Sequence, residues 1–75
     1  MKEWNKNNSI AVFVRERRKE AGYTQVQFAD FTGIGLRFLR ELEQGKPNLM
    51  MDKVNEVLSF FGHTLTPIPL NKYHQ

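Results

Sequence analysis

Arg37 and Arg40 stand three residues apart in the segment GLRFLRELEQG, which places them one turn apart if that segment is helical. Each guanidinium group is a fork of N–H donors that matches the O6 and N7 acceptors of guanine through two parallel hydrogen bonds. One good contact of this kind discriminates between bases by about 1–3 kcal/mol. The same residues could instead merely solvate an exposed helix face. We favour base recognition because of the elements that carry them.

The residues before this segment predict a short helix that begins at about Gln25. Thr24 precedes it and Gln27 follows three residues later, so each side chain can satisfy an unpaired backbone N–H of the other. This pattern is a capping box. Tyr23 and Phe28 have the spacing of a hydrophobic staple, which fixes the angle at which the chain enters the helix. Thr24 and Gln25 then lie at the positive end of the helix dipole, where a phosphate is attracted.

A tight turn separates this helix from a second one. Gly33 permits the positive φ with which a chain leaves a helix, and Gly35 is acceptable as the cap of the next helix. Gly45 and Pro47 end the second helix, because one permits a left-handed residue and the other cannot continue a helix. Phe28, Ala29, Leu39 and Leu42 are expected to face inward. The residues expected outside are Leu36, Arg37, Arg40, Glu41 and Gln44.

Two short helices joined by a turn form a helix-turn-helix, a unit that binds DNA. Its second helix lies in the major groove with its N-terminal residues nearest the base edges, while the first crosses the backbone. Beside the two arginines, Gly35 and Leu36 open this recognition helix, and Leu36 could touch a thymine methyl group. Gln44, Lys46 and Lys6 are candidate phosphate contacts, because they are polar, long and next to the motif or on the N-terminal arm.

Further helices are predicted on both sides of this unit. Ser9 can cap a first helix that ends at Gly22, and a fourth helix is expected to begin near Asn48 or Met50 and to end at Gly62. Helical spacing places four apolar residues on the inner face of the first helix: Ile10, Phe13, Val14 and Ala21. It does the same for the fourth helix with Val54, Val57, Leu58 and Phe61. We expect Arg15, Arg17 and Lys19 to solvate the outer face of the first helix. We expect Phe31, Phe38 and Phe60 to be core or dimer contacts. Met50 and Met51 are expected to fill core gaps or to lie at the start of the fourth helix.

The segment after Gly62 has a different pattern, HTLTPIPL, whose prolines exclude a helix and favour an extended edge. A single strand leaves its backbone groups unpaired, so a second copy of the chain could supply the partner. Two such tails pairing antiparallel across a two-fold axis would bury Leu65, Ile68 and Leu70, with Thr66 as a further dimerisation residue. A disordered tail is the alternative. The fold class expected is an all-α, four-to-five-helix domain with a short C-terminal strand that pairs across a dimer.

Composition bounds the kind of protein. The chain has 75 residues, 40% of them hydrophobic, which predicts one small domain with little core and favours a partner subunit. The absence of cysteine excludes a disulfide framework and a cysteine zinc site. No apolar run nears a membrane span and the N-terminus lacks a signal-peptide pattern, so we expect a soluble, cytoplasmic protein. The formal net charge of +3 suits a polyanionic partner. We divide the chain into a flexible arm (1–8), a DNA-binding domain (9–62) and a dimerisation tail (63–75).

Residues 10–62 resemble the helix-turn-helix family of phage Cro and repressor proteins, often called Xre. The resemblance is carried by RRKEAG at the end of the first helix, by YTQ and by TGIGLRFLRELEQGK. The stretch GLRFLRELEQGKP and the tail HTLTPIPL are similar to the corresponding segments of Hip-type antitoxins. Those proteins are short, dimerise through a C-terminal strand, and repress the operon that encodes them and a kinase-like toxin.

The resemblance also implies roles for individual residues. It implies that Gln25 touches the DNA backbone, and that Arg18 pairs with Glu43 as a structural ion pair. Many members have a polar residue at the position of Gly35, and small or polar residues at the positions of Leu36 and Phe38, so this chain departs from the family there. The base preference of other members therefore cannot be transferred.

An enzyme is not expected, because no set of nucleophile, base and orienting group can be assembled from this sequence. His63 and His74 are isolated and lack metal-ligand spacing, so we expect neither a metal nor a cofactor. The predicted function is sequence-specific repression by a homodimer on an inverted-repeat operator. We expect it to be the antitoxin of a Hip-type operon that regulates its own promoter. A stand-alone phage-type regulator and an adaptor that mainly holds a toxin remain alternatives.

Overall fold

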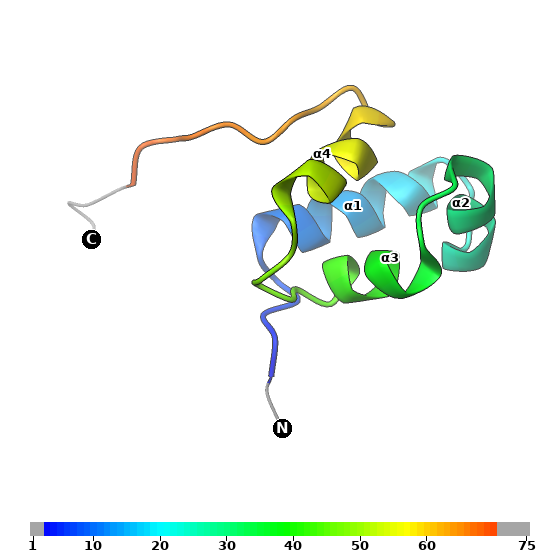
Figure 1. Ribbon diagram of the computed structural model, residues 1–75, viewed down its shortest axis with the longest axis horizontal. Helices are drawn as coiled ribbons and strands as arrows, with labels where there is room; N and C mark the ends of the chain where they lie inside the picture. The colour runs from blue at the N-terminus through cyan, green and yellow to red at the C-terminus, as the bar shows by residue number, and fades with distance from the viewer. Residues whose placement is uncertain (1–2, 71–75) are drawn as a thin grey trace.

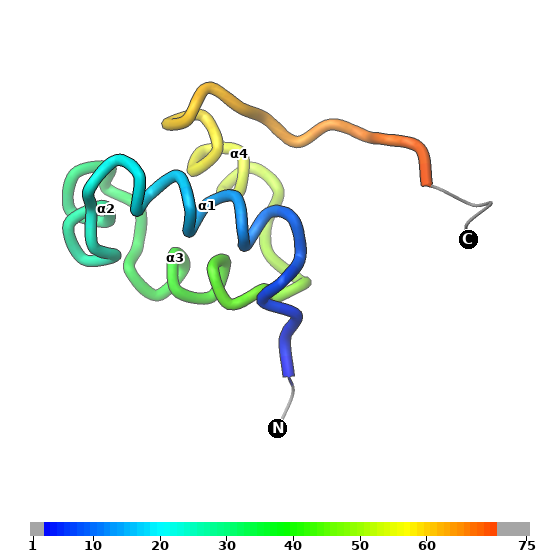
Figure 2. Tube along the Cα trace, turned by 180° about the vertical axis from the view of Figure 1, so that it is seen from behind, coloured from blue at the N-terminus to red at the C-terminus, as the bar shows by residue number. Residues whose placement is uncertain are grey.

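Four helices account for the regular secondary structure of residues 3–70, the part of the chain that a computed structural model describes. They are α1 (Ser9–Glu20), α2 (Gln25–Thr32), α3 (Leu36–Glu43) and α4 (Met51–Ser59). In Figure 1, α1 runs through the middle of the molecule, with α3 on one side, α4 on the other and α2 across the end where α1 finishes. The view from behind in Figure 2 shows the same arrangement. The all-α expectation is confirmed for these residues.

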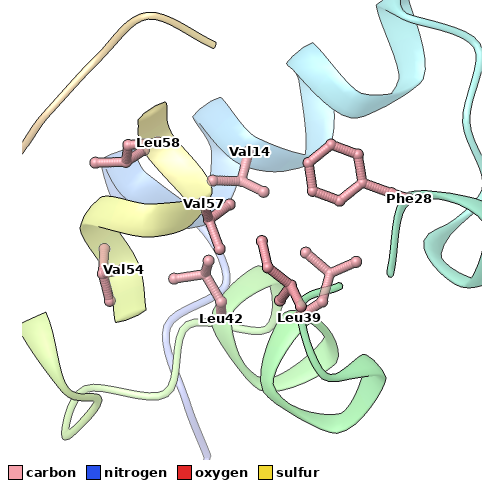
Figure 3. Close-up of a cluster of buried hydrophobic side chains, with 8 residues drawn as sticks. Val14, Phe28, Leu39, Leu42, Val54, Val57 and Leu58 are labelled. Carbon is pink, nitrogen blue, oxygen red and sulfur yellow. The ribbon is translucent and has the colours of Figure 1, made fainter. Parts of the chain in front are cut away.

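All four helices contribute to one hydrophobic core. Figure 3 shows Val14 from α1 and Phe28 from α2 facing Leu39 of α3, with Val57 of α4 beside them. The inward faces predicted for α2, α3 and α4 are confirmed by the burial of Phe28, Ala29, Leu39, Leu42, Val54, Val57 and Leu58. Ala21 is exposed, against prediction, because α1 ends at Glu20 and Ala21 lies beyond its last turn as the C-cap.

The starts of the helices form where the local sequence places them, with one exception, whereas α1 and α4 end at Glu20 and Ser59, before the glycines Gly22 and Gly62 that were predicted to end them. The capping box of α2 is present: Gln27 N–H donates to Thr24 Oγ1 at 3.0 Å, and Thr24 N–H donates to Gln27 Oε1 at 2.9 Å. The Tyr23 and Phe28 rings meet edge to face at 6.1 Å. The exception is α1, whose cap is Asn8 rather than Ser9, because Asn8 Oδ1 accepts from Ala11 N–H at 2.8 Å.

Several apolar side chains for which the core was one of two expected places are exposed instead. Met50 caps α4 and Met51 is its first residue, but both are exposed, at 61% and 71%, and fill no core gap. Phe31 is 66% exposed and Phe60 45% exposed. Their rings lie 6.4 Å apart at the outer edge of an aromatic cluster. Phe38 is half-buried against the core.

The C-terminal segment, residues 63–70, forms no strand in the described chain. It runs extended away from the helices in both views (Figures 1 and 2). The predicted strand is absent here because a strand needs a hydrogen-bonded neighbour, and residues 63–70 find none among residues 3–70 of the same chain. Only the start of the segment is anchored, through Asn55 Oδ1, which accepts from Thr64 Oγ1 at 3.0 Å and from Leu65 N–H at 2.7 Å.

A buried ion pair fixes α3 against α1 and α2. Arg18 donates from Nε to Glu43 Oε2 at 2.8 Å and from Nη2 to Glu43 Oε1 at 2.9 Å. Its Nη1 donates to the carbonyl of Tyr23 at 2.7 Å, and the Gln25 amide donates to Glu43 Oε1 at 3.0 Å. The two charged side chains are only 8% and 1% exposed. The structure thus contains the pair that the resemblance implies.

The N-terminal arm packs against the end of α3. Residues 5–8 form a turn in which Asn8 N–H donates to the Asn5 carbonyl at 3.1 Å. Gly45 is buried with φ +89°, and a Cβ built there would collide with the Asn5 carbonyl and lie 2.9 Å from Lys6 N. The arm therefore approaches a position where only glycine fits.

Replacing Gly45 by alanine should destabilise the domain more than the same change at Gly33. Both residues have positive φ, +89° and +80°, which costs an L-residue about 1–2 kcal/mol. A Cβ at Gly33 would meet nothing within 4 Å, whereas Gly45→Ala adds an overpacking cost of about 1–3 kcal/mol unless the arm is displaced. Urea denaturation followed by circular dichroism measures the loss of unfolding free energy in both variants. Equal losses would show that the arm does not pack at Gly45.

Glu43→Gln should lower the free energy of unfolding by about 3–5 kcal/mol, because it leaves the buried Arg18 guanidinium without its counter-charge. Glu41→Gln is the matched control on the same helix. Glu41 is 20% exposed and pairs at 3.5 Å and 3.3 Å with Arg37 and Lys46, and surface pairs contribute only about 0–1 kcal/mol. Thermal and urea denaturation of both variants test this; similar small losses would contradict it.

Candidate nucleic-acid interface

The outward face of α3 carries the two arginines singled out by the sequence. Arg37 has a side chain that is 92% exposed, and Arg40 is exposed as well. The opposite face buries Leu39, Leu42 and Glu43. Because these three residues hold the helix from below, the arginines are presented on the solvent side of a fixed rod. The predicted separation of inner and outer faces is present.

The charges on this face are weakly paired. Glu41 Oε2 lies 3.5 Å from Arg37 Nε, and Glu41 Oε1 lies 3.3 Å from Lys46 Nζ. Arg40 makes no ion pair with any residue between 3 and 70 within 4.0 Å. Exposed pairs of this kind contribute little stability and are screened by salt. A nucleic-acid phosphate or base can therefore replace Glu41 as the partner at small cost.

The start of α3 is open to a ligand. Gly35 caps the helix with φ −60° and ψ +134° and has no side chain that could cap it. Gly35 is exposed and Leu36 is half-buried. A Cβ at Gly35 would meet nothing within 4 Å, so packing inside the chain does not require glycine there. The first N–H groups of α3 have no partner within their own helix.

At the start of α2, the Gln25 side chain is bonded inside the protein, whereas the family resemblance implied a contact to the DNA backbone. Thr24 is exposed, and its hydroxyl oxygen accepts from Gln27 N–H. The Gln25 amide donates to Glu43 Oε1 at 3.0 Å, so this nitrogen belongs to the buried ion-pair network. Because Gln27 N–H is already bonded to Thr24, α2 offers a phosphate the remaining N–H groups of its first turn and the positive end of its dipole.

The loop after α3 adds a second group of polar side chains. Gln44 is exposed, and Lys46 has a side chain that is 27% exposed. The loop is held by backbone bonds, with Lys46 N–H donating to the Glu41 carbonyl at 3.0 Å. Lys46 Nζ also lies 5.8 Å from the centre of the Trp4 ring, which brings the N-terminal arm to this end of α3.

Arg15 is the residue that the sequence reasoning missed. We expected it on a solvated face, yet it is half-buried, and its Nη1 donates to the carbonyls of Lys6 at 2.8 Å and Glu43 at 2.7 Å. One signal was present: Arg15 lies three residues before Arg18, and residues at that spacing share a helix face. Arg17 and Lys19 are exposed, as expected.

The residues predicted to dimerise lie far from α3. The C-terminal segment leaves the molecule beside α4, on the side opposite α3 (Figure 1). Leu65 is half-buried, while Thr66, Ile68 and Leu70 are exposed. A groove of about 380 Å³ runs under the start of the segment, lined by residues of α1, α4 and the segment itself. Thus two separate surfaces, rather than one, carry the predicted site residues.

No three His, Cys, Asp or Glu residues among positions 3–70 are grouped so that they could hold a metal ion. His63 Nδ1 lies 2.7 Å from the Phe61 carbonyl, and its ring packs 4.6 Å from that of Phe13. His74 lies outside the described residues. Between residues 3 and 70, each helix is too short or too polar to cross a bilayer.

Comparisons with known proteins agree with this geometry. The family model described as Helix-turn-helix matches residues 14–68. Over 53 residues, 71% of this chain and 70% of the other, the chain is 43% identical to a Sinorhizobium fredii protein. That protein is named "Uncharacterized HTH-type transcriptional regulator y4mF". No solved structure matches significantly. The chain therefore belongs to the Xre-type helix-turn-helix family of DNA-binding transcription regulators.

Proposed function

We propose that this protein is a sequence-specific repressor that binds an inverted-repeat operator as a homodimer. The observation that carries the proposal is the exposure of Arg37 and Arg40 on α3, a helix whose orientation is fixed by the buried pair of Arg18 and Glu43. Fixed orientation matters because bidentate contacts to a base edge require a guanidinium group in one position.

In the proposed complex, α3 lies in the major groove and α2 crosses the backbone. Arg37 and Arg40 donate to O6 and N7 of guanine, and Leu36 contacts a thymine methyl group. The N–H groups at the start of α2, together with Gln44 and Lys46, contact phosphates and position the helix without reading sequence. Release of Arg37 from Glu41 accompanies binding.

One such unit reads few base pairs, and two units reading an inverted repeat would account for operator specificity. The centres of their half-sites would lie about 34–36 Å apart, or a multiple of that distance. The C-terminal segment supports a two-fold contact, because Ile68 and Leu70 are 77% and 79% exposed and the segment is already extended. We propose that two copies pair residues 64–70 as antiparallel strands, which would satisfy backbone groups that one chain leaves free.

A finer proposal is that the protein is the antitoxin of a Hip-type operon, regulates its own promoter and holds a kinase-like toxin. Phe31 and Phe60, whose exposed rings lie 6.4 Å apart, offer apolar area of the kind that protein partners cover. Two alternatives make different predictions. A stand-alone phage-type regulator would have no toxin partner, and an adaptor that mainly holds a toxin would have no DNA affinity. A kinase-like gene beside this one supports the antitoxin role, and an isolated gene weakens it.

Arg37→Ala and Arg40→Ala should each weaken binding to the protein's preferred duplex by about 1–3 kcal/mol, or roughly 5- to 150-fold. Binding to a scrambled duplex should fall much less, because base contacts are absent there. Fluorescence anisotropy measures both affinities, with the labelled fragment upstream of the protein's own gene as one duplex and a scrambled version of it as the other. Arg17→Ala is the control, since it removes the same charge from an exposed position on α1.

Two results would contradict these roles. Equal losses on both duplexes would demote Arg37 and Arg40 to phosphate contacts. No preference of the wild-type protein for the upstream fragment, or for any duplex selected from a random pool, would remove sequence-specific repression altogether.

The double substitution Ile68→Asp and Leu70→Asp should convert the dimer to a monomer and lower operator affinity at the same time. The dimer should be lost because the two substitutions place charges on the apolar side of the proposed strand pair, where burying them is costly. Light scattering gives the mass and anisotropy the affinity. Met51→Asp is the matched control, because Met51 is also apolar and 71% exposed. A dimer that persists in the double variant would remove the strand-pairing proposal.

A further inference from the structure

Arg15 joins the N-terminal arm to the C-terminal end of α3. Its Nη1 donates to the Lys6 carbonyl at 2.8 Å and to the Glu43 carbonyl at 2.7 Å. The Glu43 carbonyl is one of the last four of α3, which have no N–H partner inside the helix. A guanidinium group there also interacts favourably with the negative end of the helix dipole. One side chain thus both caps α3 and fastens the arm.

Two further contacts hold the arm in the same place. The Asn5 carbonyl and Lys6 N press against Gly45, where a Cβ would collide. The Trp4 ring lies 5.8 Å from Lys46 Nζ, within the range of a cation–π contact. The arm is therefore attached at three successive points, Trp4, Asn5 and Lys6, to the helix and loop that form the candidate interface.

The direction of the arm places its polar residues on the side of α3. In Figures 1 and 2 the blue arm leaves the domain next to the end of α3, whereas the C-terminal segment leaves beside α4 on the opposite side. Lys6 is exposed and Lys46 is partly exposed. Lys46 and the exposed Lys6 thus add cationic groups beyond the C-terminal end of α3.

We propose that residues 3–8 are a second DNA-contacting element, in which Lys6 contacts a backbone phosphate beside the groove that α3 enters. Arg15 is a positioning residue. It holds the arm in place before DNA arrives, so that binding does not carry the entropy cost of ordering the arm. A phosphate is the chemically matched partner because Lys6 is a mobile point charge without the fixed fork of an arginine. This inference rests on the proposed DNA-binding function and deepens it.

The test uses full-length protein and a fluorescein-labelled duplex that the wild-type protein has selected from a random-sequence pool. Lys6→Ala should reduce the slope of log affinity against log salt concentration by about one, as expected for one lost phosphate contact. Arg15→Gln should weaken binding roughly tenfold, because the arm is no longer held in place. Arg17→Gln is the control, since it removes the same charge from the other side of α1 and should leave the slope unchanged.

Trp4 reports the position of the arm directly, because it is the chain's only tryptophan. In the free protein its emission should move to longer wavelength in Arg15→Gln and stay unchanged in Arg17→Gln. Adding the duplex to wild-type protein should change Trp4 emission at the same concentrations that change the anisotropy. Circular dichroism checks that each variant is folded, and Lys6→Ala removes only an exposed side chain.

Different results overturn different statements. If Lys6→Ala and Arg15→Gln bind like Arg17→Gln at every salt concentration, the arm makes no DNA contact and the inference is overturned. A shift of Trp4 emission in Arg15→Gln without loss of affinity also overturns it, because Arg15 would then only stabilise the fold. Failure of the wild-type protein to select any duplex would instead remove the DNA-binding function itself.

Discussion

The structure depends on one buried ion pair, Arg18 with Glu43. The carboxylate belongs to α3 and the guanidinium to α1, while the Gln25 amide of α2 and the Tyr23 carbonyl complete their hydrogen bonds. An unpaired charge in the interior is far more costly than a paired one. Rotation of α3 about its axis would break this network and is therefore resisted. The direction in which the outer face of α3 points is a consequence of what its inner face binds.

The two glutamates of α3 have different tasks because they differ in burial. Glu43 is inside, where the low dielectric strengthens its bonds and fixes its partners. Glu41 lies at the surface between Arg37 and Lys46, where water and salt weaken both pairs. The helix consequently combines a rigid attachment with cations that can change partners. A recognition helix requires both properties, since it must be held precisely and yet release its side chains to a ligand.

The N-terminal arm and the C-terminal segment leave the domain on opposite sides (Figures 1 and 2). The N-terminal arm is attached to α3 through Arg15 and the close approach at Gly45. The C-terminal segment is anchored at its start, through Asn55, the packing of His63 on Phe13 and the half-buried Leu65, whereas Ile68 and Leu70 further along are exposed. A domain with so small a core gains from such additions, because each terminus can extend a surface without disturbing the packing of the helices. The proposed DNA contact and the proposed self-association are thereby kept apart.

The amino-acid sequence by itself determined what short-range contacts control. The capping box of Thr24 and Gln27, the turn at Gly33 and the buried stripe of α3 depend on residues a few positions apart, and they set which side Arg37 and Arg40 occupy. The family's motif also indicated Arg18 with Glu43. Only the tertiary structure decided that Arg15 is half-buried, since its partner Glu43 is 28 residues away, and that residues 63–70 form no strand within one chain. Such contacts depend on where whole helices meet, and local spacing does not contain that information.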